Sequence, residues 1–468
     1  MSLENLKLFD LFKSLSSNEL KEFKVYIKSN FVGKNEDLCR LLEFLFNKKI
    51  NDWAIITKQQ IFIFLYGDAL IYNDLKVRHM MSSLTKVLED FIAFNYLKNN
   101  PIVYKKILLH HYLQKGIEKP AKNVMNELQG IMNTETIHDA DYYRRRYELG
   151  VNNYHFQSNN IRTEDFGYSY AIENFTVYSI IETLKSACTI NTINKVMEAK
   201  IQHPLLISIL DMLPGSEYLK EPLVRMYYHL YYLVEEEKEE VFAELFSDIQ
   251  KHEMLFSQKD LNTVYRTLIN FCIKKSNENN VYYTRKAFEI YIYTIDNGVL
   301  IEHQVINRFI FTNVISLGIK LGELEQSMQF LESCQHLIHP DYSQNTIVYN
   351  LAKIYFARLE YDQALAILWT NEFKDKIWSL NSKYLILKIL FEQNDLDSFK
   401  QQFKSFKRYV KRIQNIGYHK IYFENIIQSL NILLNKRLKK KKHLEYEFSK
   451  DTSDFEWFQK MVDEFESK

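Results

Sequence analysis

The pattern of apolar and polar positions predicts helices along nearly the whole chain. Apolar residues recur at intervals of three and four over long stretches, as on one face of a helix, and the stretch 73–98 is a clear example. Ser16 and Glu19 have the spacing of a capping box, which marks a helix start. Thr57 and Gln60 form a second such pair. The N-terminal part of the chain is therefore expected to be a set of helices without an obvious repeat.

Composition points to the same fold class. The chain contains 11 glycines and 6 prolines among its 468 residues. Tight turns, bulges and phosphate-binding loops draw on glycine, so a chain this poor in glycine and proline favours long helices joined by short loops. Single cores stop growing near about 250–300 residues. We therefore expect an all-α protein with two domains or an extended stack of helices.

Residues 345–369 carry the clearest copy of a helix-pair pattern. Ala352 and Tyr355 fill the first predicted helix, and Ala364 is a small residue in the second. The pattern resembles the tetratricopeptide repeat, in which small residues let paired helices approach closely. Leu359 occupies the turn position at which the family usually has glycine, and this departure predicts a less tight turn.

Neighbouring copies of the pattern are less regular. In the copy at 311–331, Gly318 replaces the usual aromatic residue, which predicts a weaker contact. The residues taken as equivalent small contacts of successive pairs are Ala243, Ala287, Ser327, Ala364 and the bulky Phe399. The resemblance covers about residues 220–410. It implies an α-solenoid of antiparallel helix pairs, a TPR-like superhelix, that follows an N-terminal helical domain.

The predicted organisation has four segments. They are an N-terminal helical domain (1–115), a helical connecting region (116–215), the TPR-like repeats (216–410) and C-terminal capping helices (411–468). A terminal repeat needs a cap for its apolar face. The closing helix is predicted from a capping box at Ser453–Glu456 and from one apolar face made by Phe455, Phe458, Met461, Val462 and Phe465.

Charge and motifs give little support for catalysis. The 60 basic and 59 acidic residues balance, so nothing draws the whole chain toward nucleic acid or an anionic membrane. Phosphate-loop, dinucleotide-binding, nucleophile-elbow and HExxH motifs are absent from the sequence. His336, His339 and Asp341 could supply three metal ligands, but a polar loop between repeats is the favoured interpretation. We expect a protein that is not an enzyme and that needs no cofactor or metal.

The resemblance implies a protein-protein interaction scaffold. Helical repeats hold a partner protein or peptide in a groove lined by the first helix of each pair. From the family geometry, the lining is expected to include Asn313, Asn350 and Lys353. Neither the partner nor the oligomeric state follows from the sequence.

Two alternatives remain open. The run 436–443 is the densest group of basic residues, and its lysines Lys439, Lys440, Lys441 and Lys442 are candidate phosphate contacts of a nucleic-acid-associated regulatory protein. A solvated helix end is favoured for this run. An enzyme with its site in residues 1–215 is the other alternative, although no motif supports it.

Further residues have two interpretations each. Arg144, Arg145 and Arg146 extend the basic patch only if the fold brings them to it. The tyrosines Tyr227, Tyr228, Tyr231 and Tyr232 suit a peptide or base surface, but their helical spacing favours packing in the core.

The sequence also bears on location. The four cysteines are far apart, as in a reducing compartment. The chain shows neither a signal-peptide pattern nor 18 consecutive apolar residues. We expect a cytoplasmic protein without a membrane span.

Overall fold

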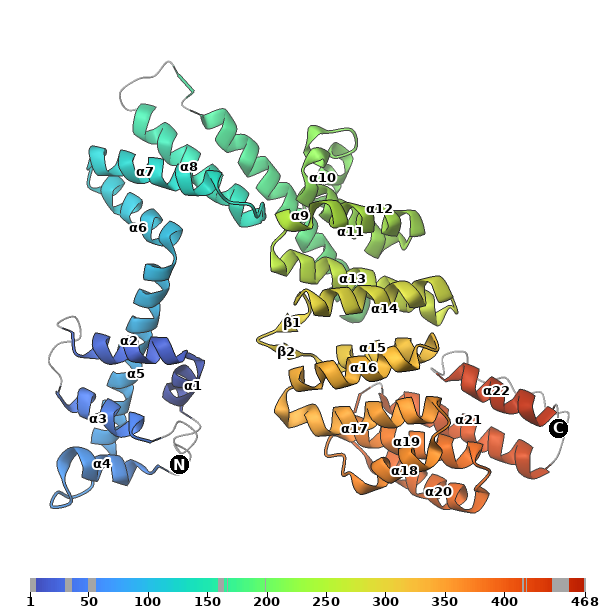
Figure 1. The fold of residues 1–468 in the computed structure, drawn as a ribbon. Coiled ribbons are helices and arrows are strands. Elements are labelled where there is room, and N and C mark those ends of the chain that lie inside the picture. Colours follow the sequence, from blue (N-terminus) through green and yellow to red (C-terminus); the bar gives the residue numbers. More distant parts are fainter. Residues whose placement is uncertain are drawn as a thin grey trace. The chain divides into compact units, whose positions relative to one another are not determined.

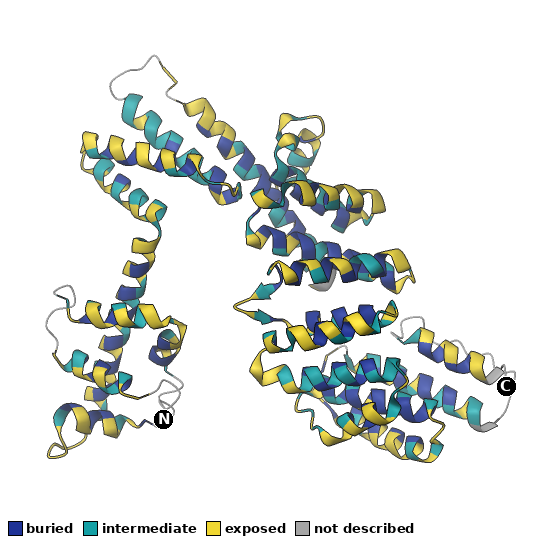
Figure 2. Ribbon diagram, in the orientation of Figure 1, coloured by how far each residue is buried: buried dark blue, intermediate teal, exposed yellow. Residues whose placement is uncertain are grey.

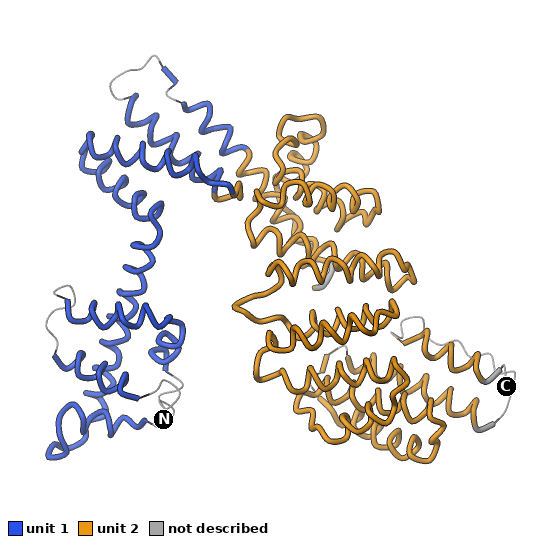
Figure 3. The backbone as a smooth tube through the Cα atoms, in the orientation of Figure 1, with its two compact units in different colours: residues 1–136, 142–176 blue, residues 137–141, 177–468 orange. Residues whose placement is uncertain are grey.

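The computed structural model describes residues 6–29, 36–48, 56–158, 164–165, 167–197, 199–414, 416–417, 419–439 and 454–466. Over these residues the protein is all-α, and one short hairpin is the exception (Figure 1). The chain forms two compact units: residues 1–136 with 142–176, and residues 137–141 with 177–468 (Figure 3). The division falls inside the stretch 116–215 that was predicted to connect two helical regions.

The first unit begins with five helices around a shared core. They are α1 (Lys7–Ser14), α2 (Ser17–Ile27), α3 (Glu36–Phe46), α4 (Lys58–Tyr66) and α5 (Asp74–Asn99). Both predicted capping boxes are present, at the starts of α2 and α4. Helix α5 matches the predicted helix over 73–98. Phe12 and Phe23 are fully buried in this core and meet edge to face, with ring centroids 5.8 Å apart.

The rest of the first unit is a smaller helical cluster. It comprises α6 (Pro101–Gln114), α7 (Glu118–Asn133), most of α8 (Ala140–Ser158) and the start of α9 (Tyr168–Met197). Gly150 lies against Ala171, and a Cβ at Gly150 would approach the Ala171 Cβ to 2.7 Å. Small residues thus let α8 and α9 pack closely.

The second unit consists mainly of helices packed in adjacent pairs. It opens with the rest of α9, α10 (Leu206–Met212) and the short helix η3 (Glu217–Lys220). The pairs are α11 (Pro222–Glu236) with α12 (Glu239–His252), α13 (Gln258–Asn277) with α14 (Val281–Asp296), α15 (Arg308–Lys320) with α16 (Leu324–Cys334), α17 (Pro340–Ala357) with α18 (Tyr361–Thr370), and α19 (Lys376–Glu392) with α20 (Leu396–Arg412).

Short elements connect and extend these pairs. They are η4 (Glu253–Leu255), η5 (Gln335–Leu337) and a two-stranded hairpin of β1 (Ile301–Glu302) and β2 (Val305–Ile306). Helices α21 (His419–Lys439) and α22 (Phe455–Glu466) follow the last pair. The buried residues gather where the helices face one another (Figure 2). The first helices also contact each other from pair to pair, α11 with α13, α15 with α17 and α17 with α19.

Four of the turns inside the pairs share one backbone geometry. Their turn residues Asn279, Gly322, Leu359 and Asn394 all have positive φ, at 65°, 78°, 63° and 64°. In each turn the next N–H donates to the carbonyl five residues back, over N–O distances of 3.2, 2.8, 2.9 and 3.0 Å. This is the closing bond of a Schellman-type helix end. The prediction of a less tight turn at Leu359 is therefore wrong, because Leu359 adopts the same conformation as Gly322.

The shared turns also fix which residues are equivalent. Five residues after each turn residue lie Thr284, Ser327, Ala364 and Phe399, and all four are buried. Thr284 thus takes the position that was assigned to Ala287, because the turn register shifts by three residues in this pair. Ala243 is exposed and its neighbour Phe242 is buried, so the contact predicted there is also displaced.

Gly318 makes a closer helix contact than was expected. A Cβ at this position would lie 2.2 Å from Ser327 Oγ and 3.2 Å from Phe288 Cε2. The glycine that replaces the usual aromatic residue therefore lets α15 and α16 approach, and it does not weaken their contact.

Two further features of the described residues concern predicted chemistry. None of the described helices is long and apolar enough to cross a membrane. The four cysteines are free thiols; Cys188 and Cys272 are buried, whereas Cys39 and Cys334 are half-buried. Burial raises the pKa of Cys272 to about 12, so this thiol stays protonated at neutral pH.

Candidate functional site

Three consecutive first helices place polar side chains on one common face. When the pairs are aligned by their turns, Ser316 of α15, Lys353 of α17 and Lys388 of α19 occupy the same position. Lys320 lies one helical turn beyond Ser316, at the end of α15. We call Lys320, Lys353 and Lys388 the lysine face.

Lys353 lies inside this face and not at its rim. Its ammonium donates to Ser316 Oγ and lies 5.8 Å from the centre of the Tyr349 ring. Burial lowers the pKa of Lys353 to about 8; Asp454 opposes this shift and the nearby charge of Lys388 adds to it. The Asp454 carboxylate thus favours the charged form of Lys353, which burial disfavours.

Lys388 is held by an acid and by aromatic rings. Its Nζ lies 3.3 Å from Asp454 Oδ2 in an ion pair that is largely buried on the lysine side. The same Nζ lies 4.9 Å from the Trp457 ring centre and 5.1 Å from that of Phe356. Aromatic faces attract a cation most where water is excluded. The charge of Lys388 is thus stabilised by side chains of α17 and by residues at the start of α22.

The Asp454 carboxylate lies close to Lys388 and Lys353. Burial by itself raises the pKa of this carboxyl, but the charges of Lys388 and Lys353 bring it below its usual value. Two residues later, Glu456 Oε1 lies 3.9 Å from Lys320 Nζ. The acids that precede and open α22 therefore face the three lysines.

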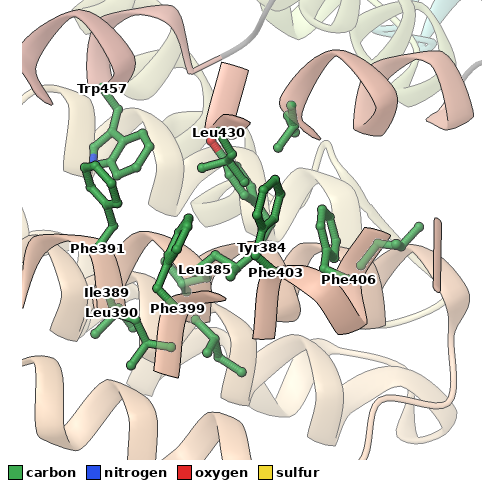
Figure 4. Close-up of a cluster of buried hydrophobic side chains, with 14 of the residues drawn as sticks. Tyr384, Leu385, Ile389, Leu390, Phe391, Phe399, Phe403, Phe406, Leu430 and Trp457 are labelled. Atoms are coloured by element: carbon green, nitrogen blue, oxygen red, sulfur yellow. The ribbon is translucent and has the colours of Figure 1, made fainter. Parts of the chain in front are cut away.

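Trp457 anchors α22 on the end of α19. Its indole N–H donates to Glu392 Oε1 over 2.5 Å, and its ring centre lies 6.0 Å from that of Phe391. Figure 4 shows Trp457 beside Phe391, with Tyr384, Phe399 and Phe403 in the same apolar cluster. The next apolar residues of α22, Phe458, Met461 and Val462, are buried in this cluster as well.

The contacts of α22 explain why α19 is buried on several sides. Ten of its 17 residues are buried, and they do not form a single stripe. A helix that is apolar on several sides is covered on several sides. Helices α17, α18 and α20 contact α19, and Trp457 covers a further part of it.

The structure places the three predicted partner-binding residues in contact with neighbouring helices. Asn350 is fully buried, and its amide donates to Thr312 Oγ1 over 3.0 Å and to the Thr346 carbonyl over 2.9 Å. Asn313 is half-buried and donates to the Tyr291 hydroxyl over 3.2 Å. Their binding role stays a prediction, and Lys353 is the one that belongs to the lysine face.

Most of the predicted phosphate contacts lie outside the described residues. This holds for Lys440, Lys441 and Lys442 and for the side chain of Lys439, as it does for Ser453 of the predicted capping box and the side chain of Phe465. The described start of the run contains Arg437, which donates to the Phe391 carbonyl over 2.8 Å and to Asn394 Oδ1 over 2.6 Å. The Arg437 guanidinium is therefore hydrogen-bonded to the end of α19 and to the turn that follows it.

The other candidates form structural contacts. His339 caps α17, because its Nδ1 accepts from the Asp341 N–H over 3.3 Å. Over the described ranges no three potential metal ligands come together. Tyr227 is buried and donates to Asp260 over 2.5 Å, as the core interpretation expects. Tyr228, Tyr231 and Tyr232 are half-buried and pack on one another.

The three arginines of the predicted patch extension belong to the first unit. Arg145 binds both carboxylate oxygens of Glu135 at 3.1 and 3.0 Å. Arg144 pairs with Glu148, and Arg146 donates to the Met132 carbonyl. Each arginine is therefore engaged locally.

Sequence reasoning missed Lys388, Glu392, Asp454 and Trp457 as a set. One signal was present: Lys353 and Lys388 lie six residues before the turn residues Leu359 and Asn394. The contact of α22 with this face had no local signal, because an amphipathic helix does not reveal which surface it covers.

Comparison with protein-family models, with curated proteins and with solved structures finds no match for this chain.

Proposed function

We propose that the chain is a non-catalytic scaffold that holds a partner protein on an α-solenoid of TPR-like helix pairs. The observation that carries the proposal is the repeated turn at Asn279, Gly322, Leu359 and Asn394, with the same hydrogen bond closing each turn. Repeats of one geometry stack into extended surfaces that suit long peptides or partner helices. A cytoplasmic location and a protein or peptide partner belong to the same proposal.

The lysine face is the part of this surface best suited to binding. Three cations on successive first helices give a row of positive charge, while Phe356, Tyr384 and Phe391 supply apolar area beside it. Interfaces commonly combine such aromatic anchors with charges that select the partner.

Affinity purification from the native cell tests the proposal. The full chain should enrich a specific protein, and Lys320→Glu should reduce its recovery, because this lysine lies at the accessible end of the face. Lys400→Glu is the matched control, since Lys400 lies on α20 and pairs with Asp397 of the same helix. Absence of any enriched protein, or equal loss with both variants, would contradict the proposal.

A further inference from the structure

The lysine face already has an occupant within the same chain. Helix α22 packs on α21, and together with the residue before it places Asp454, Glu456 and Trp457 against side chains of α15 and α19. A closing helix that only covered the last pair would contact α19 to α21. The ion pair between Glu456 and Lys320 reaches α15, two pairs earlier.

The contacts are those of a short recognition motif. Asp454 forms an ion pair with Lys388, and Glu456 forms one with Lys320. The Trp457 indole N–H donates to Glu392. Phe458, Met461 and Val462 then continue one apolar side of the helix. This is the helix-in-groove mode of binding, in which spaced apolar anchors give affinity and charges fix the register.

We infer that the lysine face is a binding site for an acidic, tryptophan- or phenylalanine-bearing helical segment of a partner protein, and that α22 is the resident segment which this partner displaces. The inference rests on the proposed scaffold function and names the chemistry of its partner. Residues 440–453 join α21 to α22, so α22 competes as a tethered ligand with a high effective concentration.

Charge favours this class of occupant over a basic or neutral one. The Asp454 carboxylate pairs with Lys388 over 3.3 Å, and its negative charge also favours the charged form of the buried Lys353. Lys388 also faces three aromatic rings, one of which, Trp457, belongs to the displaceable segment. A partner helix with two acids followed by an aromatic residue would restore each of these contacts.

A fluorescent peptide of residues 454–466 tests the inference on the full chain. Trp457→Ala weakens the resident helix and leaves the lysine face intact. We expect the peptide to bind this variant at least about tenfold more tightly than the unaltered chain, because less intramolecular competition remains. Trp369→Ala is the control, since Trp369 is exposed on α18 and should not change binding.

A charge exchange then tests the contact at Lys320. In the Trp457→Ala background, Lys320→Glu should weaken binding of the native peptide about tenfold or more. A peptide with Glu456→Lys should recover binding to that variant. Loss with both peptides, or no change with either, would show that Glu456 does not recognise Lys320 and would overturn the assignment.

Three outcomes would overturn the inference as a whole. One is no peptide binding to Trp457→Ala while hydrogen exchange shows the 455–466 amides exposed. Another is a light-scattering mass equal to two copies of the chain that decreases when peptide is added. The lysine face of one copy would then bind α22 of a second copy. The third is peptide binding that does not weaken with added salt.

A loss of folding, and a failure of the proposed scaffold function, can each be distinguished from a failure of this inference. If Trp457→Ala loses its helical circular dichroism, Trp457→Phe replaces it, because this variant keeps an aromatic ring, removes the indole N–H that donates to Glu392 and leaves the lysine face unaltered. Failure of peptide binding with either folded variant rejects the acidic segment as ligand. The scaffold proposal would still stand if affinity purification recovers a partner that Lys320→Glu releases.

Discussion

Gly318 and Ser327 are in contact where α15 meets α16, and this contact sets how closely the two helices approach. The Ser327 hydroxyl is held in place because it donates a hydrogen bond to the Glu323 carbonyl over 2.9 Å. A Cβ at Gly318 must therefore displace the Ser327 hydroxyl and also crowds the ring of Phe288.

Gly318→Ala should destabilise the chain by about 1–3 kcal/mol, as expected for overpacking, despite the better helix propensity of alanine. Urea unfolding followed by circular dichroism measures the effect. Gly318→Ala combined with Ser327→Ala removes the 2.2 Å clash and should recover most of the loss. Ser327→Ala alone is the control. A single variant as stable as the original chain would show that the contact is not tight.

Lys353 should make stability depend on pH in the alkaline range. Its pKa in the folded chain is about 8, below the value near 10.4 of an unfolded lysine. Between these values the unfolded state binds more protons, so the contribution of Lys353 to stability rises with pH.

Lys353→Met removes this contribution. The free energy of unfolding of the original chain, minus that of the variant, should increase between about pH 7.5 and 9.5. Urea unfolding at each pH gives both values. Because the tyrosines with raised pKa are common to both proteins, their effects cancel in the difference. A difference that stays constant or falls would refute the low pKa.

At the residue scale, the sequence predicted the small contact at Ala364 but not the burial of Asn350. Both lie on helices with three- and four-residue spacing, yet a polar residue between two first helices has the same pattern as one on the surface. The Thr312 hydroxyl and the Thr346 carbonyl, which accept from the Asn350 amide N–H groups, become visible only with α15 and α17 in place.

The helix pairs are joined by turns whose geometry does not depend on glycine. Only Gly322 is glycine among the four positive-φ turn residues of the pairs α13–α14 to α19–α20. Asparagine tolerates this conformation better than most residues, whereas leucine does not. The Leu359 side chain is also exposed, so its packing does little to offset the free-energy cost of the left-handed conformation.

Leu359→Gly should therefore stabilise the chain by about 1 kcal/mol, because a Cβ disfavours the left-handed conformation. The midpoint of urea unfolding should rise. Leu359→Ala keeps the Cβ and should give no comparable gain, which separates backbone strain from loss of the leucine side chain. Equal stability of all three proteins would mean that the turn carries no strain.

At the element scale, helices and their starts were predictable because capping boxes and apolar spacing are local. The boxes at Ser16 and Thr57 and the extent of α5 are examples. The register between Thr284 and Ser327 was not predictable. The hairpin β1–β2 lengthens the connection between α14 and α15, and such an insertion leaves no mark in the helix periodicity.

At the scale of the whole molecule, the buried clusters belong to separate units. The core of α1–α5 contains residues 8–91, whereas the cluster around α19 contains residues 352–462. Most helices of the second unit contact neighbours near them in sequence, so a local change should spread mainly along the pairs.

Gly318→Ala should accelerate amide hydrogen exchange in α13 to α19 and leave the exchange of α1 to α5 unchanged, because the altered contact lies in the second unit alone. Mass spectrometry of peptic fragments resolves the two regions. Faster exchange in both units to the same degree would show that the chain unfolds as one cooperative body.

The large-scale organisation was only partly predictable. The all-helical class followed from scarce glycine and proline and from the apolar spacing. The position of α22 on the lysine face did not, because Lys320 and Glu456 lie far apart in sequence and their meeting depends on the stacking of three first helices.

The buried Cys272 turns α13 into a natural reporter of opening. Its thiol is protonated and enclosed at neutral pH, so an alkylating reagent reacts only with molecules in which α13 has moved away from its neighbours. The labelling rate of Cys272 would thus report the rate of local opening around α13 in the unaltered chain.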